Sequence, residues 1–274
     1  MKFSVLISVY YKENPEYLDE ALKSILDQTL QPDEIVLIED GELTPELYKI
    51  LDKYEKIFRD MKRYSFLENK GLGVALAEGV KLCNYDLIAR MDTDDIAVKE
   101  RFEIQKRYME EHPQISICGG LLEEFNDCGN IHQTKFMPED MESIKLYAKY
   151  RNPLNHMTVM FRKDAVLSAG NYHKVPYLED YDLWSRMLTN GEQFYNIQYV
   201  LVKARVSNSL YDRRGGVKYC KEYLKLRKRQ KQWGLVEGFT YIKSCLATIL
   251  MTVVPGNIRK KIYISILRKK DKVI

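Results

Sequence analysis

The run Asp92-Thr93-Asp94-Asp95 is the part of the chain whose residue types and spacing most clearly allow chemistry. Three carboxylates this close together repel one another, and burying them requires a compensating positive charge. Hard oxygen ligands at this spacing suit Mg²⁺ or Mn²⁺, which share their remaining coordination positions with substrate phosphates. The run taken alone is also consistent with a loop in which Asp95 caps the helix that follows.

The elements around this run predict where its side chains lie. In the first half of the chain, apolar β-branched runs alternate with segments whose apolar residues recur every three or four positions. These patterns predict strands at 3–9, 34–38, 65–67 and 86–91, and helices that begin at Asn14-Pro15, at Thr44-Pro45 and at residue 72. Such βα units form a parallel sheet covered by helices on both faces, and ligands bind beyond the carboxyl ends of its strands. Asp40 and Asp92 both follow strand ends, so we expect both in one crevice.

The second half of the chain is less regular. Its patterns predict a helix near 98–111, a short helix at 180–190, and strands at 115–120, 158–162 and 194–206. From about residue 212 the pattern is helical and basic. The sequence therefore predicts an α/β domain over 1–211 and a C-terminal helical basic segment over 212–274.

With these elements in place, five segments make the chain resemble the family-2 glycosyltransferases that build bacterial exopolysaccharide, capsule and lipopolysaccharide. In chain order they are 4–10 (SVLISVY), 39–41 (EDG), 69–79 (NKGLGVALAEG), 91–95 (MDTDD) and 177–187 (YLEDYDLWSRM). The resemblance implies the GT-A fold, with a mainly parallel central sheet flanked by helices. It implies a nucleotide-binding half over about 1–97 and an acceptor half over about 98–211. The implied activity is inverting transfer of one sugar, a hexose, from a UDP-sugar to a saccharide or lipid-linked saccharide acceptor.

The resemblance also implies residues that contact the nucleotide-sugar donor. Asp40 would accept a hydrogen bond from N3–H of uracil, because a carboxylate accepts and this nitrogen donates. Lys70 and Gly71 would lie against the nucleotide where a helix begins and the backbone can approach closely. The donor site implied in this way consists of Tyr10, Glu13, Asp40, Lys70, Gly71 and Asp92.

The remaining implied roles concern a metal ion and a base. Asp94 would be the main ligand of Mn²⁺ or Mg²⁺, with Asp92 shared between the metal and the ribose, and the ion would stabilise charge on the leaving UDP. Asp180 would take the proton of the acceptor hydroxyl. Glu179 and His156 are candidates for contact with the acceptor or a phosphate. Taken alone, Asp180 is also consistent with a helix cap.

The charge of the chain is unevenly distributed. Residues 212–274 hold 17 Lys and Arg against 4 Asp and Glu, whereas residues 1–211 hold 26 against 35. In the tail, basic residues alternate with Tyr and Trp before an apolar stretch at 239–254, which predicts an interfacial anchor on an anionic membrane surface. A helical subdomain packed on the catalytic body is the alternative. No nucleic-acid partner is expected, because the acidic body would repel phosphate.

Other features bound the location and the alternatives. We expect a cytoplasmic protein, peripheral at the inner face of the cell membrane, because the sequence has neither a signal peptide pattern nor 18 consecutive apolar residues. The five cysteines contain no C-x-x-C pair and are expected to be free thiols. Arg205 and Arg213-Arg214 are placed where a late loop could close over the diphosphate. A nucleotidylyltransferase is disfavoured because residues 10–14 contain no Gly, and a catalytically inactive, nucleotide-sugar-binding scaffold at the membrane is the non-enzyme alternative.

Overall fold

The computed structural model describes residues 1–126, 131–206 and 215–254. In these ranges the strands form one sheet of nine, in the order β3-β2-β1-β4-β8-β6-β9-β5 with β7 paired to β6. The strands are β1 (Phe3–Val9), β2 (Glu34–Glu39), β3 (Met61–Ser65), β4 (Leu87–Met91), β5 (Ile96–Ala97), β6 (Ile115–Phe125), β7 (Ile131–Lys135), β8 (Met160–Arg162) and β9 (Gln193–Arg205). The helices are α1 (Pro15–Leu26), α2 (Pro45–Ile57), α3 (Leu72–Leu82), α4 (Arg101–Glu111), α5 (Met141–Ala148), the 3₁₀ helix η1 (His156–Thr158), α6 (Lys163–Ser168), α7 (Glu179–Thr189), α9 (Gly216–Gln232) and α10 (Gly238–Val253).

The first four strands are parallel, as the sequence predicted. The side chains of Asn14 and Thr44 cap α1 and α2, and a proline occupies the first turn of each helix. Alternate residues of β1 point to opposite faces of the sheet, so Val5 and Ile7 pack toward α1 and α2 while Leu6 packs toward α3. Both faces of β1 are therefore buried, which explains its continuous apolar sequence.

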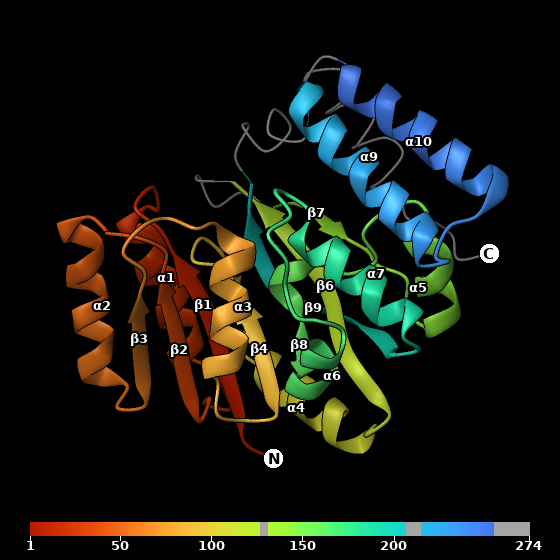
Figure 1. Ribbon diagram of the computed structural model, residues 1–274. Helices are drawn as coiled ribbons and strands as arrows, with labels where there is room; N and C mark the ends of the chain where they lie inside the picture. The colour runs from red at the N-terminus through yellow and green to blue at the C-terminus, as the bar shows by residue number, and fades with distance from the viewer. Residues whose placement is uncertain (127–130, 207–214, 255–274) are drawn as a thin grey trace.

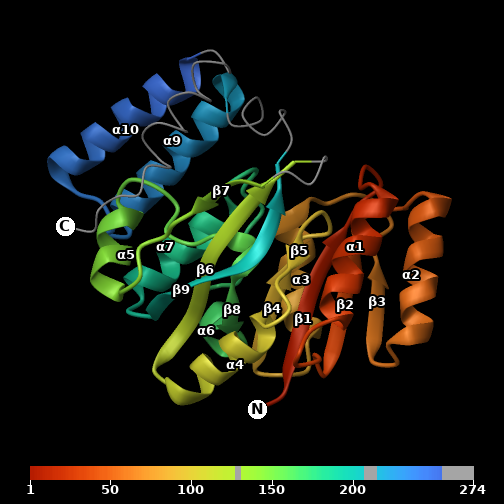
Figure 2. The ribbon, with the colours of Figure 1, turned by 180° about the vertical axis from the view of Figure 1, so that it is seen from behind.

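Beyond β4 the sheet becomes mixed. Strand β8 runs antiparallel to both β4 and β6, and β6 runs parallel to β9. Buried side chains of α4 join the core on the α1 and α2 face, whereas those of α5, α6 and α7 join the core on the α3 face. Figure 1 shows α3, α6 and α7 in front of the sheet, and Figure 2 shows the molecule from behind. The α/β fold with helices on both faces is thus confirmed.

Helices α9 and α10 lie side by side at one end of the molecule, and α9 is the inner of the two (Figure 1). Leu226, Arg227 and Gln230 of α9 are buried. The guanidinium of Arg227 donates to the Tyr181 hydroxyl of α7 (2.9 Å), and the Gln230 amide donates to the Ser185 hydroxyl (2.8 Å). Helix α9 is therefore packed on α7 of the α/β body.

Several elements lie elsewhere than the sequence predicted. The strand expected at 65–67 lies at Met61–Ser65. It is an edge strand that pairs with β2 and has polar, half-buried side chains, so an apolar sequence pattern does not mark it. The helix expected near 98 begins at Arg101, and its N-cap is Glu100 rather than Asp95. The segment 156–158 forms η1, so the strand expected at 158–162 begins at Met160.

Helices α5 and α6 and strand β7 were not predicted, because each is short. Over the ranges given above, no helix has both the length and the apolar content needed to cross a membrane. Cys83, Cys118, Cys220 and Cys245 are free thiols, as expected. Cys128, Arg213-Arg214, the junction at 211–212 and the basic segment 255–274 lie outside the described residues.

Candidate active site

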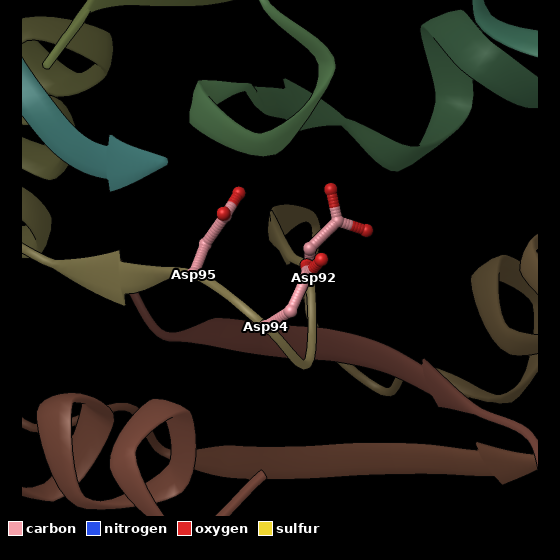
Figure 3. A group of neighbouring side chains, drawn as sticks. All are labelled: Asp92, Asp94 and Asp95. Atoms are coloured by element: carbon pink, nitrogen blue, oxygen red, sulfur yellow. The ribbon is translucent and has the colours of Figure 1, made fainter. Parts of the chain in front are cut away.

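The loop that follows β4 brings three carboxylates together. One oxygen from each of Asp92, Asp94 and Asp95 lies within 4.8 Å of the others, and Figure 3 shows Asp92 and Asp95 projecting to the same side of the loop. Burial raises the pKa of Asp94 to about 7, with further contributions from the charges of Asp92 and Glu13. Burial and Asp94 raise the pKa of Asp95 well above its usual range. Burial and mutual repulsion therefore oppose full ionisation of the cluster unless a cation neutralises it.

Arg90 is the cation that partly compensates this charge. It is the penultimate residue of the otherwise apolar strand β4, its side chain is almost fully buried, and both of its terminal nitrogens donate to the Asp92 carboxylate. The backbone carbonyl of Arg90 accepts a hydrogen bond from the Arg101 guanidinium (2.7 Å), which holds the end of β4 in place. One guanidinium facing three carboxylates leaves a negative surplus at the site.

The surplus fits a divalent cation. Oδ2 of Asp95 is buried and has no hydrogen-bond partner among the described residues. Such an orphaned oxygen, beside an Asp94 carboxyl whose pKa is already raised, matches the hard oxygen ligands that Mg²⁺ and Mn²⁺ select. The residues present thus suit the metal that the sequence suggested.

Arg205, at the end of β9, holds the acidic loop from the other side. Its backbone N–H donates to the Asp95 carboxylate (2.9 Å), and its Nε donates to the backbone carbonyl of Asp94 (3.2 Å). The guanidinium stacks on the ring of Tyr17, 3.8 Å from its centroid, and lies 4.6 Å from that of Phe125. Arg205 therefore does lie beside the acidic loop, but it binds and orders that loop.

The donor-side residues converge on the end of β2. Asp40 is nearly buried, and its carboxylate accepts backbone hydrogen bonds from Lys70 (2.7 Å) and Gly71 (2.9 Å) and one from the Asn69 amide (3.0 Å). A Cβ on Gly41 would come within 2.8 Å of the Asn69 nitrogen, so glycine lets the two loops touch. Asp40 thus orders the 69–71 loop, and about one of its four lone-pair positions remains for a base.

Tyr10 and Glu13 flank the acidic loop on the β1 side. Tyr10 is 39% exposed, and its ring packs edge-on against Tyr11. The Glu13 carboxylate accepts hydrogen bonds from the Thr93 hydroxyl and from the Asn14 backbone (2.8 Å). Glu13 therefore joins the loop after β1 to the acidic loop, whereas Tyr10 offers a ring surface to solvent.

The second pair of carboxylates is at the start of α7. Oδ1 of Asp180 accepts from the Tyr181 backbone N–H (2.7 Å), and Oδ2 accepts from the Asn152 amide. The N-cap of α7 is Leu178, so Asp180 is not the cap. Burial raises the pKa of Asp180, and burial together with Asp180 raises the pKa of Glu179 to about 7.

Arg90 links the two acidic groups. Its charge lowers the pKa of Asp180 and of Glu179, while the charge of Asp92 raises that of Glu179. A Cβ on Gly73, in the first turn of α3, would lie 2.4 Å from the His173 carbonyl and 3.2 Å from Cβ of Glu179. The start of α3 that follows the donor loop, the acidic loop and the start of α7 are therefore neighbours.

His156 lies in η1, near Arg90. Its Nε2 is 3.0 Å from the Tyr172 hydroxyl, and its ring packs edge-on against Trp184. Burial and the nearby Arg90 lower the pKa of His156 well below its usual value, so the imidazole is neutral. These contacts give His156 a structural role, and its contact with an acceptor stays a prediction.

The sequence did not predict the roles of three polar residues of the site. Arg90 was passed over as part of an apolar strand, although a lone arginine in a buried run signals a buried counter-charge. Asn152 and the ordering role of Arg205 lacked a local signal, because each acts on a residue distant in sequence. A sheet with a carboxylate cluster after β4, a glycine-containing loop before α3 and a carboxylate pair at the start of α7 is the arrangement expected from the sequence for a GT-A glycosyltransferase.

Comparison with known proteins places the chain within that class. The model of glycosyl transferase family 2 matches residues 4–168. The amylovoran biosynthesis glycosyltransferase AmsE of Erwinia amylovora is 40% identical over 92% of this chain and 95% of its own length. The UDP-Gal:α-D-GlcNAc-diphosphoundecaprenol β-1,3-galactosyltransferase of Escherichia coli is 35% identical over 98% of this chain and 97% of its own length. The chain belongs to glycosyl transferase family 2.

A solved structure supports the fold assignment. The mannosyltransferase PcManGT of Pyrobaculum calidifontis, determined with GDP-Man and Mn²⁺, superposes with a TM-score of 0.65 at 11% identity, over 94% of this chain and 71% of that one. The family assignment, the GT-A fold and the glycosyltransferase activity expected from the sequence are thus confirmed. The nucleotidylyltransferase and the inactive scaffold are not favoured. The roles of individual residues stay predictions.

Proposed function

We propose that this protein is an inverting glycosyltransferase that uses a UDP-sugar, a divalent metal and a lipid-linked diphosphosaccharide acceptor in cell-surface polysaccharide synthesis. The observation that carries the proposal is the proximity of the Asp92–Asp95 cluster, the start of α3 that follows the 69–71 loop, and the Glu179-Asp180 pair. The names of the Erwinia and Escherichia relatives support the pathway, the uridine nucleotide and the acceptor class.

The donor is held by residues from three loops. Asp40, which already orders the 69–71 loop, accepts from uracil N3–H with its remaining lone-pair position. Lys70 and Gly71 lie against the nucleotide where α3 begins. The ring of Tyr10 and the carboxylate of Glu13 complete the donor side from the loop after β1.

The acidic loop binds the sugar diphosphate. Asp94 and Asp92 would hold Mn²⁺ or Mg²⁺, and such an ion supplies charge neutralisation for the departing diphosphate. Because Arg90 occupies the Asp92 carboxylate from one side, Asp92 is fixed in orientation for the ribose or the metal. Asp95 is tied through Oδ1 to the Arg205 backbone and keeps the loop in place, while its unpartnered Oδ2 remains available to the same ion.

Asp180 is the base in this proposal. Its carboxylate is fixed by Asn152 and the Tyr181 backbone, so it is oriented before the acceptor arrives. It takes the proton from the acceptor hydroxyl while that oxygen attacks the anomeric carbon, and a single displacement inverts the configuration. Glu179, whose pKa is about 7, is placed to hydrogen-bond the acceptor sugar in either protonation state.

The test is nucleotide release from a panel of UDP-, GDP- and dTDP-sugars with Mn²⁺, with and without EDTA. We expect slow release from a UDP-sugar that EDTA abolishes, and faster release when an acceptor is added. Absence of metal-dependent release from every donor, together with absence of nucleotide binding in calorimetry, would reject the proposal.

We further propose that α10 lies on an anionic membrane surface. Its polarity is inverted: Ser244, Thr248 and Thr252 are buried, whereas Phe239, Ile242, Leu246, Ile249 and Leu250 are exposed. The three buried hydroxyls donate to backbone carbonyls of α10 itself, which satisfies them without water. An apolar outer face next to the basic residues of α9 supports an interfacial helix.

The membrane proposal is tested on the full chain, because truncation at residue 211 would also remove the buried Arg227 and Gln230 that pack on α7. We expect the double variant Leu246→Glu/Leu250→Glu to lose co-sedimentation with phosphatidylglycerol vesicles. Ile57→Glu, at an exposed apolar position of α2, should co-sediment like the wild type. Unchanged co-sedimentation of the α10 variant refutes the anchor.

A further inference from the structure

A basic depression of about 340 Å³ lies between α9 and the loop that leads into α7. Its lining includes Lys225, Lys228 and Arg229 from one side of α9, and Lys174 and Val175 from the loop. None of these residues belongs to the donor site or to the metal cluster. The depression is open to solvent, so a ligand can reach it without a change in the fold.

The charge in this depression exceeds what the protein neutralises. Glu222 pairs with Lys225: the Lys225 Nζ and the Glu222 Oε1 are 2.7 Å apart, so this pair offsets one positive charge. Among the described residues, neither Lys174 nor Lys228 pairs with an acidic side chain. Two cations thus remain for a ligand.

Arg229 adds a third group that points to an anion. Its terminal nitrogen lies 3.1 Å from the buried Asp182 carboxylate of α7, which Arg186 and His173 also contact. Asp182 is therefore already neutralised by Arg186, so Arg229 adds positive charge to the depression. Its Nε is buried and has no acceptor among the described residues. Lysines around an arginine with an unmet donor are suited to phosphate oxygens.

The depression is also close to the proposed base along the chain. Lys174 and Asp180 are six positions apart in the sequence, so their Cα atoms are at most about 20 Å apart. The segment between them is folded rather than extended, because Leu178 N–H donates to the Val175 carbonyl (3.2 Å). The flexible Lys174 side chain shortens this distance further.

We propose that this depression binds the diphosphate of the lipid-linked acceptor while the acceptor sugar reaches Asp180. The inference rests on the proposed function. It adds a second phosphate site, distinct from the donor diphosphate site at the acidic loop. The lipid chain then extends toward the apolar outer face of α10, on the far side of α9 (Figure 1).

Direct binding tests the site without assuming the acceptor sugar. Decyl diphosphate is titrated into the full-length protein with Mn²⁺ and saturating UDP, so that the donor site and its metal site are both occupied, with decyl glucoside as the uncharged probe. We expect Lys174→Ala/Lys228→Ala to weaken decyl diphosphate binding about tenfold or more, because two charged hydrogen-bond donors are lost. Lys218→Ala/Lys221→Ala, which removes two exposed lysines of α9 outside the depression, should leave the affinity unchanged.

Three results overturn the inference. One is an equal loss of affinity in both double variants, which indicates unspecific attraction. Another is decyl diphosphate binding that UDP abolishes, which indicates the donor site. The third is weakened binding of phosphatidylglycerol vesicles with unchanged decyl diphosphate binding, which indicates a phospholipid headgroup site. UDP binding by each variant, measured in parallel, separates these outcomes from failure of the proposed function.

Discussion

Asp180→Asn tests the assignment of the base with the smallest structural change. The asparagine keeps Oδ1, which accepts from the Tyr181 N–H at 2.7 Å, but it cannot take a proton. Its Nδ2 replaces the oxygen that accepts from Asn152, so the Asn152 amide must turn to present its oxygen. The fold and the donor site should therefore survive the change.

The expected loss of transfer rate in Asp180→Asn follows from the role of Asp180 as general base. A positioned general base contributes about 10²–10⁴-fold to the rate, or about 3–5 kcal/mol of transition-state stabilisation. Because burial raises the pKa of Asp180, the wild-type kcat/KM should also fall with decreasing pH at a midpoint above that of an ordinary aspartate, about 3.9. In the variant this acid limb should disappear from the residual rate.

The assay compares sugar transfer with UDP binding in the same preparation. The control is Asp164→Asn, which removes an exposed carboxylate from the first turn of the neighbouring helix α6. We expect unchanged UDP affinity for both variants and loss of transfer for Asp180→Asn alone. Transfer by Asp180→Asn within about threefold of the wild type would show that another group acts as base, since such a ratio is far below the contribution of general-base catalysis.

Asp94→Asn should weaken metal-dependent UDP-sugar binding and leave the small metal-independent component. Calorimetry with Mn²⁺ and with EDTA measures both components. Equal affinities of the wild type under the two conditions would contradict the metal role. Gly73→Val should lower both donor affinity and transfer, because a Cβ there would lie 2.4 Å from the His173 carbonyl and force α3 away from α7; wild-type values for both would show that the contact is dispensable. The free energy of unfolding in EDTA should fall as pH rises toward about 7, because folded Glu179 holds a proton that the unfolded chain has released above about 4.5. Denaturant unfolding at about pH 5.5 and about pH 8 should show a smaller fall for Glu179→Gln, and an unchanged fall would refute the raised pKa.

The parts of this fold that the sequence predicted are those in which local pattern and burial agree. Strand β1 is buried on both faces and has a continuous apolar sequence, and α1 begins with a capping Asn14 followed by Pro15. Strand β3 was misplaced because it is an edge strand whose polar side chains pair across the sheet, as Arg63 does with Glu39 (2.6 Å). Its identity depends on its neighbour β2 and not on its own pattern.

The site was predicted to the extent that its residues follow strand ends or a recognisable segment. Asp40, the Asp92–Asp95 cluster and the Glu179-Asp180 pair were proposed in this way, and the structure places them on neighbouring segments, whereas their roles stay predictions. The groups that bind them were not found. Arg90 interrupts an apolar strand, and Asn152 contacts Asp180 across 28 positions of sequence, so only the folded chain reveals either pairing.

The basic tail shows most clearly why summed charge cannot assign a role. On α9, Arg227 is buried and donates to Tyr181 and to the Lys149 carbonyl (3.0 Å), so it acts as part of the catalytic body. Arg229 pairs with buried Asp182, and Lys228, one residue earlier, is exposed in the depression. Neighbouring cations of one helix thus order α7, face a candidate diphosphate site or remain in solvent, according to their direction around the helix. An Arg227→Met variant should therefore disturb α7 and transfer, whereas Lys221→Ala should disturb neither, although the two changes remove the same net charge.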